Sequence, residues 1–171
     1  ARFVQKSHTA LPSAFLSPLV GPLGTVIEGR PRFYVRVAPT PRLPLAGGPP
    51  VPVALLKAFM GDDGRLLPGL PGLGYAGAVL EGMGSGHVLA GVAPLLGDLA
   101  AKIPVVLSSR AMTGHVFEET YGYDGAEIDL LKRGLIPSGC LSGLKARLLL
   151  ALAARGGAGR DAVAAAFAPF R

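Results

Sequence analysis

The chain has 171 residues, a length that suits one domain with an additional segment. Half of the residues are hydrophobic, which is enough for an aliphatic core, and tryptophan is absent. The 25 glycines and 16 prolines lie between apolar segments rather than in one tract, so we expect a folded chain with many turns. No run of about 18 apolar residues is free of glycine or proline, and the sequence therefore predicts no membrane span.

The net charge of +6 is unevenly distributed along the chain. Residues 1–42 carry six basic side chains and one acidic side chain, whereas residues 43–171 carry eleven basic and ten acidic ones. Nucleic-acid-binding proteins can be this basic, but the sequence has no basic run interleaved with aromatic residues. We therefore expect no nucleic-acid partner. A nucleic-acid-binding module, which would bind DNA or RNA in a salt-dependent way, is the weaker hypothesis.

The residues that could bind a metal are few and scattered. Cys140 is the only cysteine, so neither an internal disulfide nor a thiolate metal site can form. His8 and His115 lack metal-ligand spacing with other donors, and we expect neither a metal nor another cofactor. A lone cysteine in an aliphatic stretch is either a packing residue or a nucleophile, and packing is the more common case.

The first part of the chain, residues 1–37, is predicted to be an arm that contains a β-hairpin. Thr25–Ile27 and Arg32–Val37 have strand composition, and Glu28–Arg30 lies between them as a turn. Residues 38–52 then contain prolines at positions 39, 41, 44, 49, 50 and 52. Because proline fixes φ, this segment is predicted to be an extended linker at a domain boundary.

From residue 53 onward, strand-like and helix-like segments alternate. We expect strands at 53–59, 77–81 and 103–109 and an edge strand at 135–137. We expect a weak helix at 66–73 and further helices at 88–101, 126–133, 142–154 and 161–167, with Ser142 and Asp161 as N-caps and Leu144, Leu148 and Leu152 on one helical face.

This alternation predicts an α/β fold. A small parallel, Rossmann-like sheet flanked by helices would form residues 53–171, preceded by the β-hairpin arm and the proline-rich linker. Ligands of such sheets bind at the carboxyl ends of the strands. We therefore place the candidate site at Gly82–His87 and in the long polar loop that follows Ser109.

Five sequence blocks follow one another along the second part of the chain: Gly77–His87, Ile103–Arg110, Tyr121–Asp129, Gly134–Gly139 and Lys145–Arg147. Their order and spacing resemble those of the bacterial-type L-asparaginases, the asparaginase/glutaminase family. The resemblance implies that residues 53–171 form the C-terminal domain of that family. Residues 1–37, through blocks such as Ala1–Thr9, resemble the end of its N-terminal domain.

The resemblance implies hydrolysis of L-asparagine to L-aspartate and ammonia, with L-glutamine as an open second substrate. In the family a threonine in a Thr-Gly-Gly-Thr-Ile type segment attacks the side-chain amide, and an Asp-Gly-Thr-Asp-Thr type segment supplies a second threonine and an aspartate. Neither segment occurs in residues 1–171. We therefore expect the nucleophile on a missing N-terminal segment and the chain alone to be inactive. Whether the chain is a fragment, a nicked product or a truncated gene product stays open. The alternative is a truncated, non-catalytic domain that acts in assembly or regulation.

The resemblance also implies roles for single residues. Lys6 aligns with the family's catalytic lysine, whose amine can act as a base when burial lowers its pKa; the alternative is a solvated charge. Glu127 aligns with the acidic residue that a neighbouring protomer places near the substrate's α-amino group; the alternative is an ordinary glutamate in the first turn of a helix. Asp129 is expected to be only such a helix-start charge.

The glycine-rich turn supplies two further candidates for substrate binding. His87 stands where many relatives have an asparagine, and its charge would depend on pH. Ser85 is expected to line the site, although small turn residues usually serve geometry. Gly82–Gly86 lacks the GxGxxG spacing, so a dinucleotide site is rejected.

Other polar residues are expected to be structural. No histidine–acid pair accompanies Ser108 and Ser109 in the sequence, and Tyr121 and Tyr123 are expected to pack.

Because sites in the family are shared between protomers, we expect a homodimer or homotetramer. We expect a cytoplasmic location and leave export open.

Overall fold

The computed structural model describes residues 3–39, 42, 47–49 and 51–171. The chain divides into two compact units, Ala1–Arg42 and Leu43–Arg171. This division falls within the predicted linker, of which residues 40–41, 43–46 and 50 lie outside the described part of the chain.

The unit Ala1–Arg42 contains two antiparallel strand pairs. The two strands of the second pair are joined by a turn of Glu28 and Gly29, whose φ angles are 51° and 73°. A type I′ hairpin turn requires positive φ angles at both of these positions. The predicted hairpin is thus confirmed, but its second strand begins at Arg30, which pairs with Ile27, because a two-residue turn is sufficient. The strands are β1 Gln5–Lys6, β2 Phe15–Leu16, β3 Gly24–Ile27 and β4 Arg30–Phe33.

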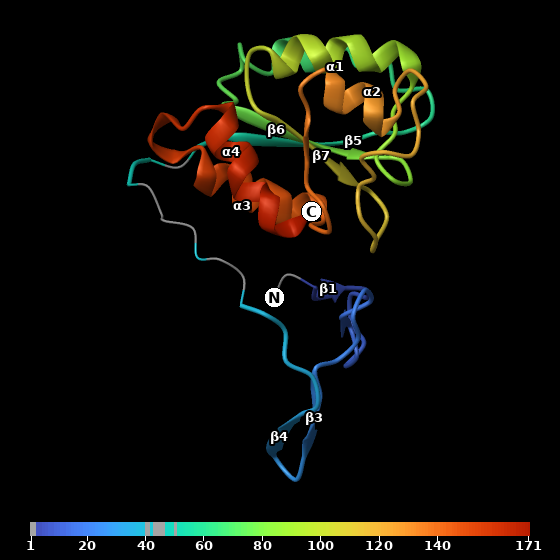
Figure 1. Ribbon diagram of the computed structural model, residues 1–171, viewed down its shortest axis with the longest axis vertical. Coiled ribbons are helices and arrows are strands. Elements are labelled where there is room, and N and C mark those ends of the chain that lie inside the picture. The colour runs from blue at the N-terminus through green and yellow to red at the C-terminus, as the bar shows by residue number, and fades with distance from the viewer. Residues whose placement is uncertain (1–2, 40–41, 43–46, 50) are drawn as a thin grey trace. The chain divides into compact units, whose positions relative to one another are not determined.

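The unit Leu43–Arg171 is built on one parallel sheet, and the predicted α/β fold is confirmed (Figure 1). The sheet order β5-β6-β7-β8 follows the chain order. Pro137 lies in β8 at the edge of the sheet, where a residue without an N–H group removes no ladder bond from the interior. The strands are β5 Val53–Lys57, β6 Gly77–Gly82, β7 Val105–Ser109 and β8 Ile136–Pro137.

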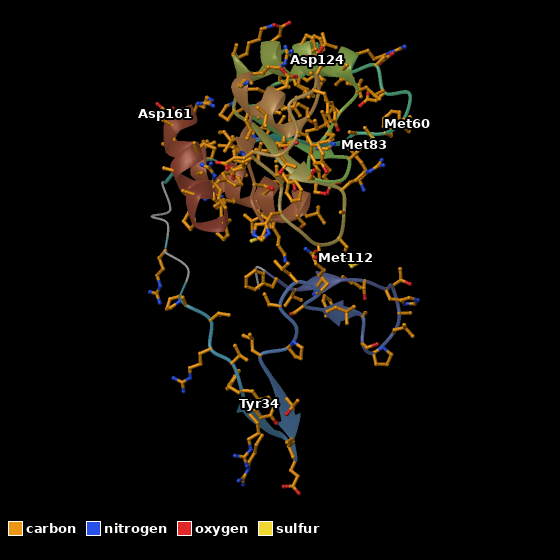
Figure 2. All side chains as sticks on the ribbon, turned by 45° about the vertical axis from the view of Figure 1, so that its right-hand side comes forward. Tyr34, Met60, Met83, Met112, Asp124 and Asp161 are labelled. Carbon is orange, nitrogen blue, oxygen red and sulfur yellow. The ribbon has the colours of Figure 1, made fainter. Side chains whose placement is uncertain are left out.

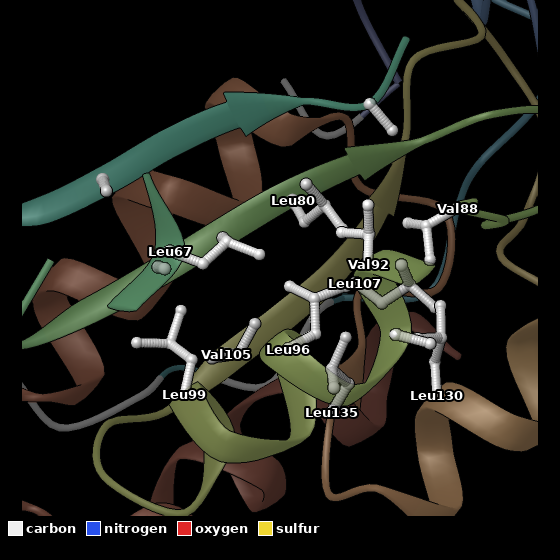
Figure 3. Close-up of a cluster of buried hydrophobic side chains, with 14 of the residues drawn as sticks. Leu67, Leu80, Val88, Val92, Leu96, Leu99, Val105, Leu107, Leu130 and Leu135 are labelled. Carbon is white, nitrogen blue, oxygen red and sulfur yellow. The ribbon is translucent and has the colours of Figure 1, made fainter. Parts of the chain in front are cut away.

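Helices cover both faces of this sheet, with α1 and α2 on one face and α3 and α4 on the other (Figure 1). Because side chains alternate along a strand, Leu80 and Leu107 join the core on the α1 side (Figure 3), whereas Val79 and Val106 join the core on the α3 side. The helices are α1 Ala93–Ala100, α2 Glu127–Lys132, α3 Gly143–Ala153 and α4 Arg160–Phe167, with single 3-10 turns at Leu67–Gly69, Ala90–Val92, Arg155–Gly157 and Ala168–Phe170.

The structure differs from the sequence-based predictions at one short helix and at the N-caps of two helices. The weak helix expected at 66–73 is reduced to a 3-10 turn, because Pro68 and Pro71 prevent regular helical hydrogen bonding. Asp161 does not cap α4: the N-cap position belongs to Gly159, and the Asp161 side chain is exposed in the first turn (Figure 2). Ser142 occupies the N-cap position of α3, but its hydroxyl makes no capping bond.

The leucines of α3 divide between two faces of the helix. Leu144, Leu148 and Leu152 lie on one face, as their spacing predicts, yet they are 67%, 60% and 37% exposed. The face that packs against the sheet instead carries Ala146 and Leu150, both fully buried.

Replacing Leu150 with alanine should lower the free energy of unfolding by about 2 to 5 kcal/mol, because the substitution leaves a cavity between α3 and the sheet. Leu148→Ala is the matched control on the same helix, and we expect a change below about 0.5 kcal/mol. Urea unfolding followed by circular dichroism measures both. Equal losses in the two variants would contradict the assignment of the buried face.

Candidate active site

The two segments predicted to form the site lie side by side at the carboxyl edge of the sheet. The turn Met83–His87 follows β6, and the loop 110–125 follows β7. The Ser109 hydroxyl donates to the Gly84 carbonyl, and the Phe117 N–H donates to the Ser85 carbonyl at 3.0 Å. These bonds join the turn to the loop, as expected for a ligand site of a parallel sheet.

The glycine-rich turn is a tight reversal that requires its glycines. Met83 and His87 exchange two backbone hydrogen bonds of 2.8 Å, which close the turn. A Cβ atom on Gly82 would lie 2.9 Å from the Cα of Gly86, too close for any other residue at this position. The turn thereby places the side chains of Ser85 and His87 next to the start of α2.

Glu127, the first residue of α2, is a fully buried carboxylate with hydrogen-bond donors at both oxygens. Its Oε1 accepts the backbone N–H groups of Thr120 and Tyr121, at 3.0 and 2.6 Å. Its Oε2 lies 3.0 Å from Nε2 of His87. The side chain therefore does more than favour a helix dipole: it binds the loop after β7 and the turn after β6 together.

The pKa of Glu127 is lowered from its ordinary value of 4.5. Burial by itself would raise this pKa, but the backbone N–H groups of Tyr121, Glu127 and Thr120 and the His87 side chain outweigh it by stabilising the charged form. The group is consequently a carboxylate at neutral pH, and it acts only as an acceptor.

Both ring nitrogens of His87 have partners. Nε2 lies 3.0 Å from the hydroxyl of Ser85 and 3.0 Å from Glu127, whereas Nδ1 lies 2.7 Å from the hydroxyl of Tyr123. In a nucleophilic triad the serine and the acid would contact different nitrogens. Here they share one, which argues against Ser85 as a nucleophile. The bond to Tyr123 was missed from the sequence, where packing alone was expected.

The remaining polar candidates have structural contacts. Ser108 is buried and donates to the Leu141 carbonyl at 2.9 Å. Asp129 accepts bonds of 2.9 Å from the Gly125 N–H and the Arg133 guanidinium, so it organises the start of α2. Among the described residues, no group of three or more histidine, cysteine, aspartate or glutamate side chains is arranged to hold a metal.

Lys6 belongs to the unit Ala1–Arg42, where it lies in β1 and is exposed. Its ammonium group lies 5.6 Å from the centroid of the Phe15 ring, within cation–π distance. The other three candidates lie together in the unit Leu43–Arg171, where Ser85 and Glu127 each contact Nε2 of His87.

A cavity of about 550 Å³ lies at the carboxyl end of β5. Its walls are mainly apolar, with charged side chains such as Lys57 and Arg65 among them. Ser85, His87 and Glu127 do not line it, so the cavity and the carboxylate–imidazole cluster are separate features of this edge.

The parallel sheet, with a buried carboxylate and an imidazole at its carboxyl edge, defines an α/β domain with a candidate site at that edge. Residues 52–167 match the glutaminase/asparaginase C-terminal domain, and the chain belongs to this family. The resemblance inferred from the sequence blocks is thereby confirmed.

Individual relatives agree with this assignment. The chain is 32% identical to a probable L-asparaginase of Deinococcus radiodurans, over 98% of this chain and 51% of the relative. The crystal structure of a probable cytoplasmic L-asparaginase from Campylobacter jejuni matches with a TM-score of 0.82 and 29% identity, over 99% of this chain and 51% of that one. One component of a glutamyl-tRNA(Gln) amidotransferase from Methanosarcina acetivorans is 33% identical over 78% of this chain and 32% of its own length. The chain thus spans about half the length of these two asparaginases.

Glu127→Gln should lower the free energy of unfolding by about 1 to 3 kcal/mol near neutral pH, because the charge that its three donors stabilise is lost. Since the folded-state pKa of Glu127 is lowered, its contribution is complete above pH 4.5 and is lost as the pH falls through the lowered value. The difference between wild type and variant should therefore shrink in acid. Urea unfolding at neutral and acidic pH tests this, with the exposed Glu119→Gln as control. A difference independent of pH would contradict it.

Proposed function

We propose that the chain is part of an amide hydrolase that converts L-asparagine to L-aspartate and ammonia, with L-glutamine as a second substrate. The observation that carries the proposal is the match of residues 52–167 to the glutaminase/asparaginase C-terminal domain. The cluster of Ser85, His87 and Glu127 supports it, because it supplies a negative charge and polar groups at the ligand edge of the sheet.

In this proposal the cluster recognises the amino-acid end of the substrate. The negative charge of Glu127 favours the α-ammonium group electrostatically. Because the carboxylate is fully buried, the direct contacts fall to the partly exposed Ser85 and His87. A charge that is shielded from water attracts an ammonium group more strongly than one in water. The buried carboxylate would therefore select for α-amino acids.

The nucleophile of the proposed reaction is a threonine on polypeptide beyond the 171 residues. Its hydroxyl oxygen bonds to the side-chain amide carbon to form an acyl-enzyme, and the C–N bond breaks so that the amide nitrogen leaves as ammonia after gaining a proton. Water then cleaves the acyl-enzyme and regenerates the threonine. Lys6 would take the hydroxyl proton in the first step. Residues 1–37, in this proposal the end of an N-terminal asparaginase domain, would carry this lysine, and the linker 38–52 would follow them.

The proposed assembly is a homodimer or homotetramer in which one copy's residues 53–171 complete a neighbour's site. Within the described part of the chain, no helix is long and apolar enough to cross a membrane. We propose a cytoplasmic location, although relatives differ: the Campylobacter jejuni protein is named cytoplasmic, and a Haemophilus influenzae relative, 33% identical over 90% of this chain, is named periplasmic.

Two other functions compete with free amino-acid hydrolysis. The first is a non-catalytic domain that acts in assembly or regulation. The second is a component of an amidotransferase, which is favoured by the similarity to the Methanosarcina acetivorans protein. Ammonia release that requires added glutamyl-tRNA would favour the second competitor. Absence of ammonia release with every substrate would favour a non-catalytic domain.

Lys6→Met should lower ammonia release from L-asparagine by at least about 100-fold, because the proton acceptor is removed. The assay combines this chain with the half of the Deinococcus radiodurans relative that it does not match. Lys102→Met, at an exposed position in the other unit, should stay within about twofold of wild type. Size-exclusion chromatography should show unchanged assembly for both variants. Full activity of Lys6→Met would exclude the proposed proton transfer.

Glu127→Gln should raise the KM for L-asparagine by about tenfold while kcat changes little, because the lost charge weakens ammonium binding. Steady-state kinetics in the same reconstituted system measure the two constants, with Glu119→Gln as control. An unchanged KM would count against a role for Glu127 in recognition.

A further inference from the structure

We propose that Tyr123 is a positioning residue whose hydroxyl, together with Glu127, holds the His87 imidazole in one orientation and one tautomer. The expected effect of Tyr123 on turnover rests on the proposed function, whereas its effect on the imidazole does not.

The geometry places one partner at each end of the ring. The Tyr123 hydroxyl lies 2.7 Å from Nδ1, and Glu127 lies 3.0 Å from Nε2. A 180° rotation of the imidazole about its bond to Cβ would replace both nitrogens with carbons at these positions. Both hydrogen bonds would then be lost, so the two partners together select one of the two ring orientations.

The same contacts select one of the two neutral tautomers of the ring. A carboxylate can only accept, so the hydrogen must sit on Nε2 for the bond to Glu127 to form. A neutral ring with this hydrogen has a lone pair on Nδ1, which accepts the O–H of Tyr123. The opposite neutral tautomer would place a lone pair of Nε2 against the carboxylate and remove the acceptor that Tyr123 needs. The Nε2–H tautomer therefore satisfies every group in the chain of contacts.

Tyr123 itself is held by the backbone at the start of α2. Its carbonyl accepts the N–H of Ala126 at 2.9 Å, which fixes the loop immediately before the helix. Its ring meets the imidazole edge-on, with centroids 5.4 Å apart at 80°. Tyr121 makes a similar ring contact at 5.1 Å and 80°, so the hydroxyl bond to Nδ1 distinguishes Tyr123 from its neighbour.

A fixed Nε2–H also determines what Ser85 can offer a ligand. The Ser85 hydroxyl lies 3.0 Å from Nε2, so with hydrogen on this nitrogen it can only accept, as the second acceptor of the N–H that Glu127 shares. Its own hydrogen is then available to an acceptor such as a substrate carboxylate. Through His87, Tyr123 would thus set the donor direction of Ser85.

Nitrogen NMR of the full chain, labelled at histidine, tests the positioning directly. The His87 signals are assigned by their loss in His87→Asn. Wild type at pH 8 should show a hydrogen on Nε2 and an unprotonated Nδ1 that accepts a hydrogen bond. In Tyr123→Phe the Nδ1 resonance should move toward the value of an unbonded nitrogen. Tyr121→Phe, the matched control, should leave it in place.

A hydrogen on Nδ1 in the wild type, or an Nδ1 resonance unchanged in Tyr123→Phe, would overturn the positioning role. In the reconstituted enzyme, Tyr123→Phe should raise the KM for L-asparagine about two- to tenfold, the worth of one hydrogen bond, with kcat within about twofold. If wild type releases no ammonia, the proposed function fails while the NMR result still decides the role of Tyr123.

Discussion

The buried carboxylate of Glu127 is the constraint on which the candidate site depends. Removing a charge from water is costly unless donors replace the lost hydration, and unpaired buried charges are therefore rare. Here two backbone N–H groups and one imidazole provide that replacement. Because the donors come from the turn after β6 and the loop after β7, a single side chain on α2 determines how three separate segments meet.

The sheet explains why these segments are close enough to meet. In a parallel sheet all carboxyl ends lie at one edge, so the connections after neighbouring strands are neighbours as well. Additional bonds connect the loop 110–125 to Gly139 and Arg171. The Val116 N–H donates to the Gly139 carbonyl at 3.2 Å, and Glu118 pairs with the guanidinium of Arg171. The loop has little regular structure, yet it is anchored at both its middle and its end.

Under the proposed function, residues 53–171 contribute recognition, whereas the proposed proton acceptor, Lys6, lies in the other unit. The cluster around Glu127 provides charge, an imidazole and hydroxyl groups, and within the described residues its serine is not arranged as the nucleophile of a triad. The histidine at position 87 has a ring with two nitrogens, and each nitrogen has a partner. Tyr123 supplies the second partner, which links the buried carboxylate to a residue of the long loop.

The sequence by itself determined the class of fold, a hairpin with its turn within Glu28–Arg30 and the edge of the sheet where the candidate site lies, because these follow from local periodicity, turn chemistry and strand polarity. Only the tertiary structure decided which leucines of α3 are covered, since several of its faces are apolar and spacing alone cannot choose among them. The same holds for the site. The contacts of His87 with Tyr123 and Glu127 join residues 36 and 40 positions apart, and burial and hydrogen bonding at that separation arise only when the chain has folded.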